Sequence, residues 1–273
     1  MDKLLRPCIA ELVGVFALVF VTGGTICMSQ LADKPGQPQP YALGVALAQG
    51  FIFAAMLAAT VRVSGGFLNP AVTVTLWVFK RIELQRACWL IGAQLLGGLL
   101  AAVALHLAFT EDVLLHAHGG TPHLNIEAFS ASAPRFTYVR ALLSGIGIEF
   151  VLTFLLTFVI YGALLDPRAP QTGALGPGLA IAALTLLAYP LTGAAFNPAR
   201  WLGPAIVEQA KLSSQAFQDH PIYWVGPFFG ALAAGGLYEY LIWPEADTGK
   251  PPAVESQAPG EGPVTATLYK KKK

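Results

Sequence analysis

Charged residues are scarce in this chain. Only 12% of its 273 residues are Asp, Glu, Lys or Arg, whereas a soluble globular domain carries about 25%. The formal net charge is +1, which gives no sign of a nucleic-acid partner. Hydrophobic residues make up 55% of the chain, and its mean hydropathy is +0.57. This composition excludes an ordinary soluble domain and indicates a protein that crosses a lipid bilayer several times.

Cysteine is also scarce, and the recognisable motifs of catalysis are missing from the sequence. Cys8, Cys27 and Cys88 have neither metal-type nor redox-type spacing, so they read as small apolar residues of membrane helices. The sequence shows no phosphate-binding loop, zinc motif or Ser-His-Asp set. We therefore expect no enzyme, no cofactor and no metal ion.

Long apolar runs dominate what is present. Runs of roughly membrane-spanning length fall near residues 8–29, 41–61, 88–109, 138–162, 175–191 and 222–243. The first is too long for a signal-peptide core and lacks a convincing cleavage site, so it reads as a retained helix. Two shorter apolar segments, 64–80 and 192–208, stand after the second and the fifth run.

Each short segment contains the same tripeptide, Asn69-Pro70-Ala71 in one and Asn197-Pro198-Ala199 in the other. Asn is a favoured helix N-cap, and Pro is favoured at the first helical position. Each tripeptide therefore predicts the start of a half-helix lodged between membrane spans. Two such starts in corresponding halves of a membrane protein indicate a solute pathway.

The two halves of the chain match in further detail. Glu11 and Glu149 are each followed by Phe at offsets of five and nine, and both short segments read Ser/Thr-Gly-x-x-x-Asn-Pro-Ala. Three spans per half is an odd number, so the second half must insert upside down. We expect an all-α membrane protein with a single domain, 1–243, built from inverted repeats near 1–137 and 138–243.

Lys and Arg predict the orientation. With the N-terminus in the cytoplasm, twelve of them lie inside and five lie outside or in the pathway, which favours two cytoplasmic termini. The Pro/Gly-rich tail 244–273 should be disordered and cytoplasmic. Its four terminal lysines fit a lipid contact, a retrieval signal or a cloning remnant.

The 110–137 segment should then be a long extracellular loop. It carries His116, His118 and His123. A metal site there is one reading, but a solvated polar loop is the favoured one.

The paired Asn-Pro-Ala boxes, the second extended by Arg200, resemble the aquaporin (major intrinsic protein) family. The duplicated Glu and the run Trp224-Val225-Gly226-Pro227 carry the same resemblance, which covers about residues 5–243. It implies six membrane helices with two re-entrant half-helices, assembled as a homotetramer with one pore per subunit. It also implies that water passes Asn69 and Asn197, while the half-helix ends and Arg200 oppose protons and cations.

The resemblance places Gln49, Thr185 and Ala194 beside Arg200 in the selectivity filter. Gln49 replaces the usual aromatic residue and Thr185 the usual His, so the filter should be wider and more polar than in most water channels. Tyr223-Trp224 and the small Ala205 instead favour water over glycerol. A passive water channel is therefore expected, and a broader pore for hydrogen peroxide, ammonia, urea or glycerol is the alternative.

Four further residues complete the expected site. Phe67 stands where the family usually has His and should narrow the cytoplasmic vestibule, while Trp201 has no assigned role beyond packing. Glu11 and Glu149 are expected to hold the two re-entrant loops by accepting backbone hydrogen bonds. A proton relay in a coupled carrier is the competing interpretation of this carboxylate pair. A structural or junctional membrane protein with a vestigial pore is a further alternative for the function of the whole protein.

Overall fold

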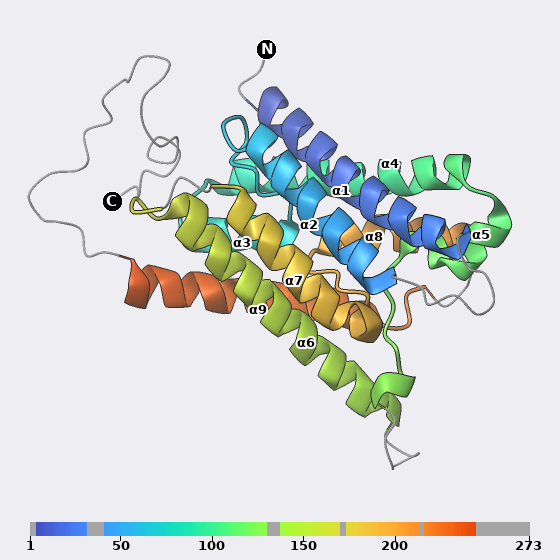
Figure 1. Ribbon diagram of the computed structural model, residues 1–273. Helices are drawn as coiled ribbons and strands as arrows, with labels where there is room; N and C mark the ends of the chain where they lie inside the picture. Colours follow the sequence, from blue (N-terminus) through green and yellow to red (C-terminus); the bar gives the residue numbers. More distant parts are fainter. Residues whose placement is uncertain (1–3, 32–40, 130–136, 170–172, 213–215, 244–273) are drawn as a thin grey trace, which may run out of the picture.

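The computed structural model describes residues 4–31, 41–129, 137–169, 173–212 and 216–243, and the regular elements of these ranges are all helical (Figure 1). The long helices are α1 (Leu5–Leu31), α2 (Tyr41–Thr60), α4 (Leu84–Ala108), α6 (Thr137–Ile160), α7 (Leu175–Thr192) and α9 (His220–Leu237). Single π-helical segments, η4 (Tyr161–Leu165) and η5 (Tyr238–Ile242), prolong α6 and α9. The short helices α3 (Pro70–Val78) and α8 (Pro198–Lys211) begin at the two predicted positions.

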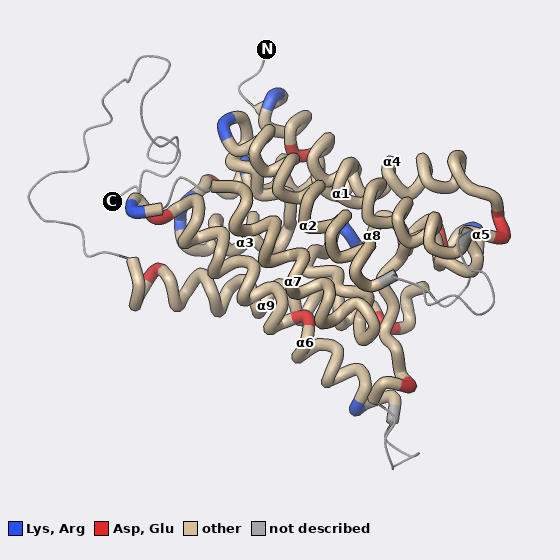
Figure 2. Tube along the Cα trace, in the orientation of Figure 1, with Lys and Arg blue, Asp and Glu red and all other residues tan. Residues whose placement is uncertain are grey.

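The six predicted spans are confirmed. Six helices of the described residues are long and apolar enough to cross a membrane, and charged residues gather mostly at the two ends of the bundle (Figure 2). Large apolar side chains point outward along these helices, as at Leu107, Leu143 and Leu187. In water such exposure would be costly, but in a bilayer these side chains contact lipid. The tail 244–273 lies outside the described residues.

The packing of the helices shows the inverted repeat. α1 packs on α2 and α4, and α6 packs on α7 and α9 in the same way. α8 lies against α4, and its counterpart α3 lies against α9. α2 and α7 pack against each other, where Gly50 meets Gly178. These two glycines are as far apart in sequence as the two Asn-Pro-Ala boxes, so equivalent positions meet at the pseudo-two-fold axis.

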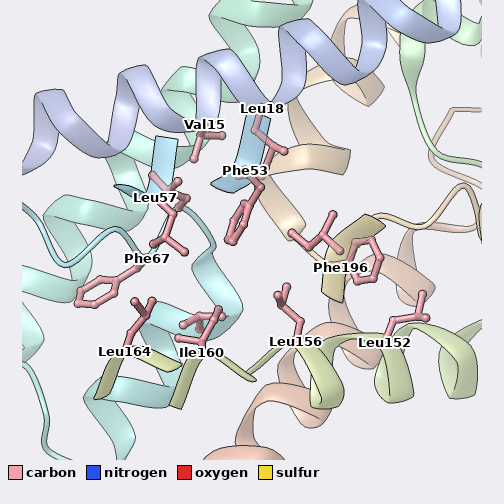
Figure 3. Close-up of a cluster of buried hydrophobic side chains, with 14 of the residues drawn as sticks. Val15, Leu18, Phe53, Leu57, Phe67, Leu152, Leu156, Ile160, Leu164 and Phe196 are labelled. Carbon is pink, nitrogen blue, oxygen red and sulfur yellow. The ribbon is translucent and has the colours of Figure 1, made fainter. Parts of the chain in front are cut away.

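A buried apolar cluster surrounds the places where the half-helices begin (Figure 3). α1 contributes Val15 and Leu18, and α2 contributes Phe53 and Leu57. α6 adds a row that ends in η4, and Phe196 joins this row from the segment before the second box. The cluster therefore fixes the chain on the approach to α8.

The described part of the 110–137 segment, residues 110–129, differs from the solvated loop that the sequence predicts. It begins with α5 (Glu111–His116), continues through the single turns η1 (His118–Gly120) and η2 (Glu127–Phe129), and buries residues 119–122. Gly119 and Gly120 have positive φ, a conformation that glycine adopts without steric cost. A Cβ at Gly120 would lie 2.7 Å from the Cα of Gly23. The loop therefore turns back into the bundle and packs on α1.

Candidate functional site

The two half-helices begin in the same way. Asn69 caps α3, because its side-chain oxygen accepts a hydrogen bond of 2.9 Å from the backbone N–H of Ala71. Asn197 caps α8 through the same bond of 2.9 Å from Ala199, with a second of 3.3 Å from Arg200. Both caps satisfy N–H groups that a helix start otherwise leaves unpaired.

The caps are also joined to each other across the axis. The amide nitrogen of Asn69 donates to the carbonyl oxygen of Phe196 at 2.9 Å, and that of Asn197 donates to the carbonyl oxygen of Leu68 at 2.6 Å. An amide NH₂ has two hydrogens, so each Asn keeps a second donor for a solute. The positive ends of two helix dipoles meet at this point, each equivalent to roughly half a unit charge.

The residues that carry these carbonyl groups have left-handed backbone conformations. Leu68 and Phe196 have φ of 50° and 56°, and Ala194 has 49°. A positive φ is uncommon for residues other than glycine, and it concentrates at functional sites where the surroundings enforce it. The positive φ recurs at the equivalent positions Leu68 and Phe196 of the two repeats. It is therefore a symmetric feature of the junction between the half-helices.

Glu11 receives four hydrogen bonds inside the bundle. One carboxylate oxygen accepts from the Ser64 hydroxyl at 2.5 Å and from the Phe67 N–H at 3.0 Å. The other accepts from the Leu68 N–H at 2.6 Å and from the Gln94 amide at 2.7 Å. The carboxylate therefore holds the segment that leads into α3. Gln94 is a partner that the sequence gave no reason to single out.

Glu149 does the same in the second half. Its oxygens accept from the Thr192 hydroxyl at 2.7 Å, the Ala195 N–H at 3.0 Å and the Phe196 N–H at 2.8 Å. Both carboxylates are fully buried. Buried carboxylates are tolerated when hydrogen bonds compensate their lost hydration, and here the donors come from the re-entrant segments.

The four expected filter residues are all buried. The Gln49 amide donates to the Ala194 carbonyl oxygen at 3.2 Å, and Nη1 of Arg200 donates to the Gly120 carbonyl oxygen at 2.8 Å. Gly120 comes from the 110–137 segment, which the sequence did not connect to this site. Among the described residues, no partner accepts from Nε or Nη2 of Arg200, and none bonds the free oxygen of Gln49 or the Thr185 hydroxyl.

Phe67 and Trp201 both prove to be packed inside the bundle. Phe67 is 3% exposed and belongs to the apolar cluster of Figure 3. Trp201 is fully buried, stacks on Tyr223 with ring centroids 5.3 Å apart, and meets Phe217 and Trp224 edge-on. The Tyr223 hydroxyl in turn donates to the Thr192 carbonyl oxygen at 2.8 Å. Trp201 thus packs α8 against α9.

Two of the three histidines converge on a carboxylate that the sequence reading missed. Nδ1 of His118 lies 3.2 Å from one oxygen of Glu208, and Nε2 of His123 lies 2.8 Å from the other. His116 instead contacts Asp112 in its own helix. Burial alone would lower the pKa of His123, but the carboxylates of Asp219 and Glu208 outweigh it and raise the pKa to about 9.

Two half-helices that meet at their N-termini, within six membrane-length helices related by an inverted repeat, define a membrane channel protein. The chain belongs to the major intrinsic protein family, whose sequence profile matches residues 1–238.

Similar proteins come from several kingdoms. The chain is 38% identical over 241 residues to "Aquaporin TIP4-4" of Zea mays, covering 87% of this chain and 86% of that protein. It is 32% identical to "Aquaporin AqpM" of Methanothermobacter marburgensis, covering 88% and 99% of the two chains. The fold matches the X-ray structure of the aquaglyceroporin from Plasmodium falciparum with a TM-score of 0.71 at 21% identity, over 88% of this chain and 97% of that one.

Proposed function

We propose that the protein conducts water passively down osmotic gradients while excluding protons and ions. The observation that carries this proposal is the junction of the half-helices, where hydrogen bonds on both the side-chain oxygen and the amide nitrogen fix Asn69 and Asn197. Each side-chain oxygen is used by its own helix cap, and one amide hydrogen is used by the opposite segment. The remaining amide hydrogens are the natural donors to a passing water oxygen.

This arrangement also provides a reason for proton exclusion. A water oxygen that accepts from both Asn residues points its own hydrogens away from the junction, which interrupts a continuous chain of proton transfer. The converging positive helix ends raise the cost of a cation at the same point. Arg200 adds a full positive charge one turn further along α8, where an intramembrane charge marks a functional position by default.

The filter that we propose consists of Gln49, Thr185, Ala194 and Arg200. The oxygen of Gln49, the hydroxyl of Thr185 and two guanidinium nitrogens of Arg200 have no partner among the described residues. Hydrogen bonds between water and these atoms can compensate for those that water loses when it leaves bulk solvent. The Gln49 amide donates a hydrogen bond to the Ala194 carbonyl oxygen, and this bond fixes the position of the Gln49 side chain. Gln49 and Thr185 are smaller than the aromatic and His that they replace, and this favours a broader neutral-solute pore as the second candidate.

Glu11 and Glu149 act in this proposal as supports of the two re-entrant segments. Seven hydrogen-bond donors surround the pair, and four of these donors are backbone N–H groups. A carboxylate that carries protons in a coupled carrier needs to exchange its partners during each cycle. These two are held by the backbone that shapes the pathway, so a passive pore is the better reading.

We further propose that residues 1–243 form one channel domain and that both termini face the cytoplasm. Lys and Arg support this orientation, because many of them lie at the end of the bundle where α1 begins (Figure 2). The apolar side chains on the outer faces of the long helices can contact lipid or neighbouring subunits, which is compatible with a homotetramer.

Stopped-flow light scattering of proteoliposomes, with water and each candidate solute tested separately, distinguishes the two functions. Wild-type protein should carry water strongly, and Thr185→His should reduce permeation of glycerol and urea more than that of water, because it restores a bulky group to the filter. A wild-type protein that carries glycerol or urea but no water above protein-free vesicles would contradict the water-channel proposal.

A further inference from the structure

Two histidines from the segment that follows α5 converge on Glu208. In Figure 1, α5 lies at the end of the bundle opposite the start of α1. Glu208 stands near the end of α8, and the histidines come from the segment between α4 and α6. The Glu208 side chain is 1% exposed and that of His118 is 58% exposed. The cluster is therefore anchored in the protein and open to solvent on one side, where it lines a surface pocket.

The spacing of the ligand atoms suits a metal ion. One potential ligand atom each from His118, His123 and Glu208 all lie within 4.8 Å of one another. Ligand atoms around a tetrahedral zinc ion lie roughly 3.3 Å apart, given bonds of about 2.0–2.1 Å. The His118 side chain is 58% exposed, so its ring has room to change orientation when an ion binds.

A second carboxylate, that of Asp219, lies near the other ring nitrogen of His123. His123 directs Nε2 toward Glu208, and its Nδ1 lies 3.8 Å from an oxygen of Asp219. The other Asp219 oxygen accepts from the Leu124 N–H at 2.6 Å, which fixes the carboxylate. Histidines that bind metals through one ring nitrogen commonly donate from the other to a carboxylate or carbonyl.

We propose that His118, His123 and Glu208 bind Zn²⁺ or a similar borderline divalent ion, with water as the fourth ligand. Two imidazole nitrogens and one carboxylate oxygen suit zinc, whereas Mg²⁺ and Ca²⁺ prefer oxygen ligands alone. Three protein ligands with an open fourth position differ from structural zinc sites, in which four protein ligands close the coordination.

The segment that carries His118 and His123 also contacts Arg200, a residue of the proposed filter. Gly120 lies between the two histidines, and its carbonyl oxygen accepts from Arg200. Glu208 and Arg200 both belong to α8. A bound ion would replace the direct contacts of His118 and His123 with Glu208 by metal–ligand bonds. It would therefore change how the segment that carries the Gly120 carbonyl is held against α8. Zinc on this side of the membrane should therefore change water permeability, a consequence that rests on the proposed channel function.

Zinc binding by the full-length protein in detergent tests the site directly. The protein is purified with an affinity tag that contains no histidine, and zinc chloride is titrated by calorimetry. The variant His118→Asn removes a ligand while keeping a residue that tolerates the positive φ of 49° at this position. His116→Asn is the matched control, since His116 is exposed nearby and lies outside the cluster.

We expect one zinc ion per chain in the wild type and in His116→Asn, with affinity weakened at least about tenfold in His118→Asn. Glu208→Gln should weaken it too. Zinc binding that is equal in the wild type and His118→Asn, or no zinc binding by the wild type, would overturn the proposal.

A second measurement separates the site from its effect on the pore. External zinc should alter water permeability of wild-type proteoliposomes and leave His118→Asn unaffected. Binding without any change in permeability would refute the coupling to Arg200, while the absence of water permeability at all would refute the proposed function. The calorimetric result is independent of either outcome.

Discussion

The crossing of α4 and α8 offers a sharp test of how closely the helices must approach to shape the pore. A Cβ added at Gly98 of α4 would lie 2.4 Å from the carbonyl oxygen of Ala199, whereas ordinary contacts of this kind lie at 3.4–4 Å. Ala199 is the last residue of the second Asn-Pro-Ala box and precedes Arg200. Gly98→Ala therefore requires α4 and α8 to separate by roughly 1 Å, an overpacking change.

The matched control is on the same helix. A Cβ at Gly92 meets nothing within 4 Å, so Gly92→Ala adds only the helix propensity of alanine, which favours the folded state by about 1 kcal/mol. Gly98→Ala gains the same stabilisation from helix propensity, and it also introduces the steric clash with the Ala199 carbonyl oxygen. The propensity cancels in the comparison, so the difference between the variants is the overpacking cost of about 1–3 kcal/mol.

Thermal unfolding of both variants in detergent measures this difference. Since 1 kcal/mol shifts the midpoint of a protein of this size by about 2–4 °C, Gly98→Ala should unfold roughly 2–12 °C below Gly92→Ala. It should also lower water permeability per protein, because α8 carries the second box and Arg200. Equal midpoints and equal permeabilities would refute the close crossing of α4 and α8 as a determinant of the pore.

Three further substitutions test individual groups. Arg200→Val should raise proton leakage, because it removes the positive charge from the pathway; a pH-sensitive dye inside proteoliposomes measures this, and an unchanged leak counts against Arg200 as a barrier. Glu149→Gln should cost about 2–4 kcal/mol, because one acceptor oxygen replaces two that together receive three donors; wild-type thermal stability would contradict this. Wild-type protein should be weakly sensitive to mercury, and Ala194→Cys should become sensitive in a water-permeability assay. Rapid block of the wild type at a low mercury concentration that did not map to Cys8, Cys27 or Cys88 would contradict the expected place of Ala194 in the filter.

The helical architecture follows from local signals in the sequence. Apolar runs of membrane length have no other stable conformation in lipid, because only a helix satisfies their backbone groups internally. Asn69-Pro70 and Asn197-Pro198 specify helix starts through capping chemistry that involves only neighbouring residues. The symmetric Glu11 and Glu149 could be matched to the re-entrant segments because the repeat placed both features twice.

The remaining parts of the site depend on contacts between distant segments. The bonds from Asn69 to Phe196 and from Asn197 to Leu68 exist only when the two half-helices meet. Glu208 resembled an ordinary polar residue near a helix end, and its histidine partners lie 85 and 90 residues away. The sequence predicts a solvated loop over 110–137, because the polar composition of this segment gives no sign of the buried turn at Gly119 and Gly120.

The osmotic water permeability of proteoliposomes, measured together with their proton conductance, tests the central claim most directly. We predict water permeability well above that of protein-free vesicles, with weak temperature dependence and with proton conductance no higher than that of the lipid alone. Water permeability equal to that of empty vesicles, or proton conductance that rises in step with water flow, would contradict the account of the junction at Asn69 and Asn197.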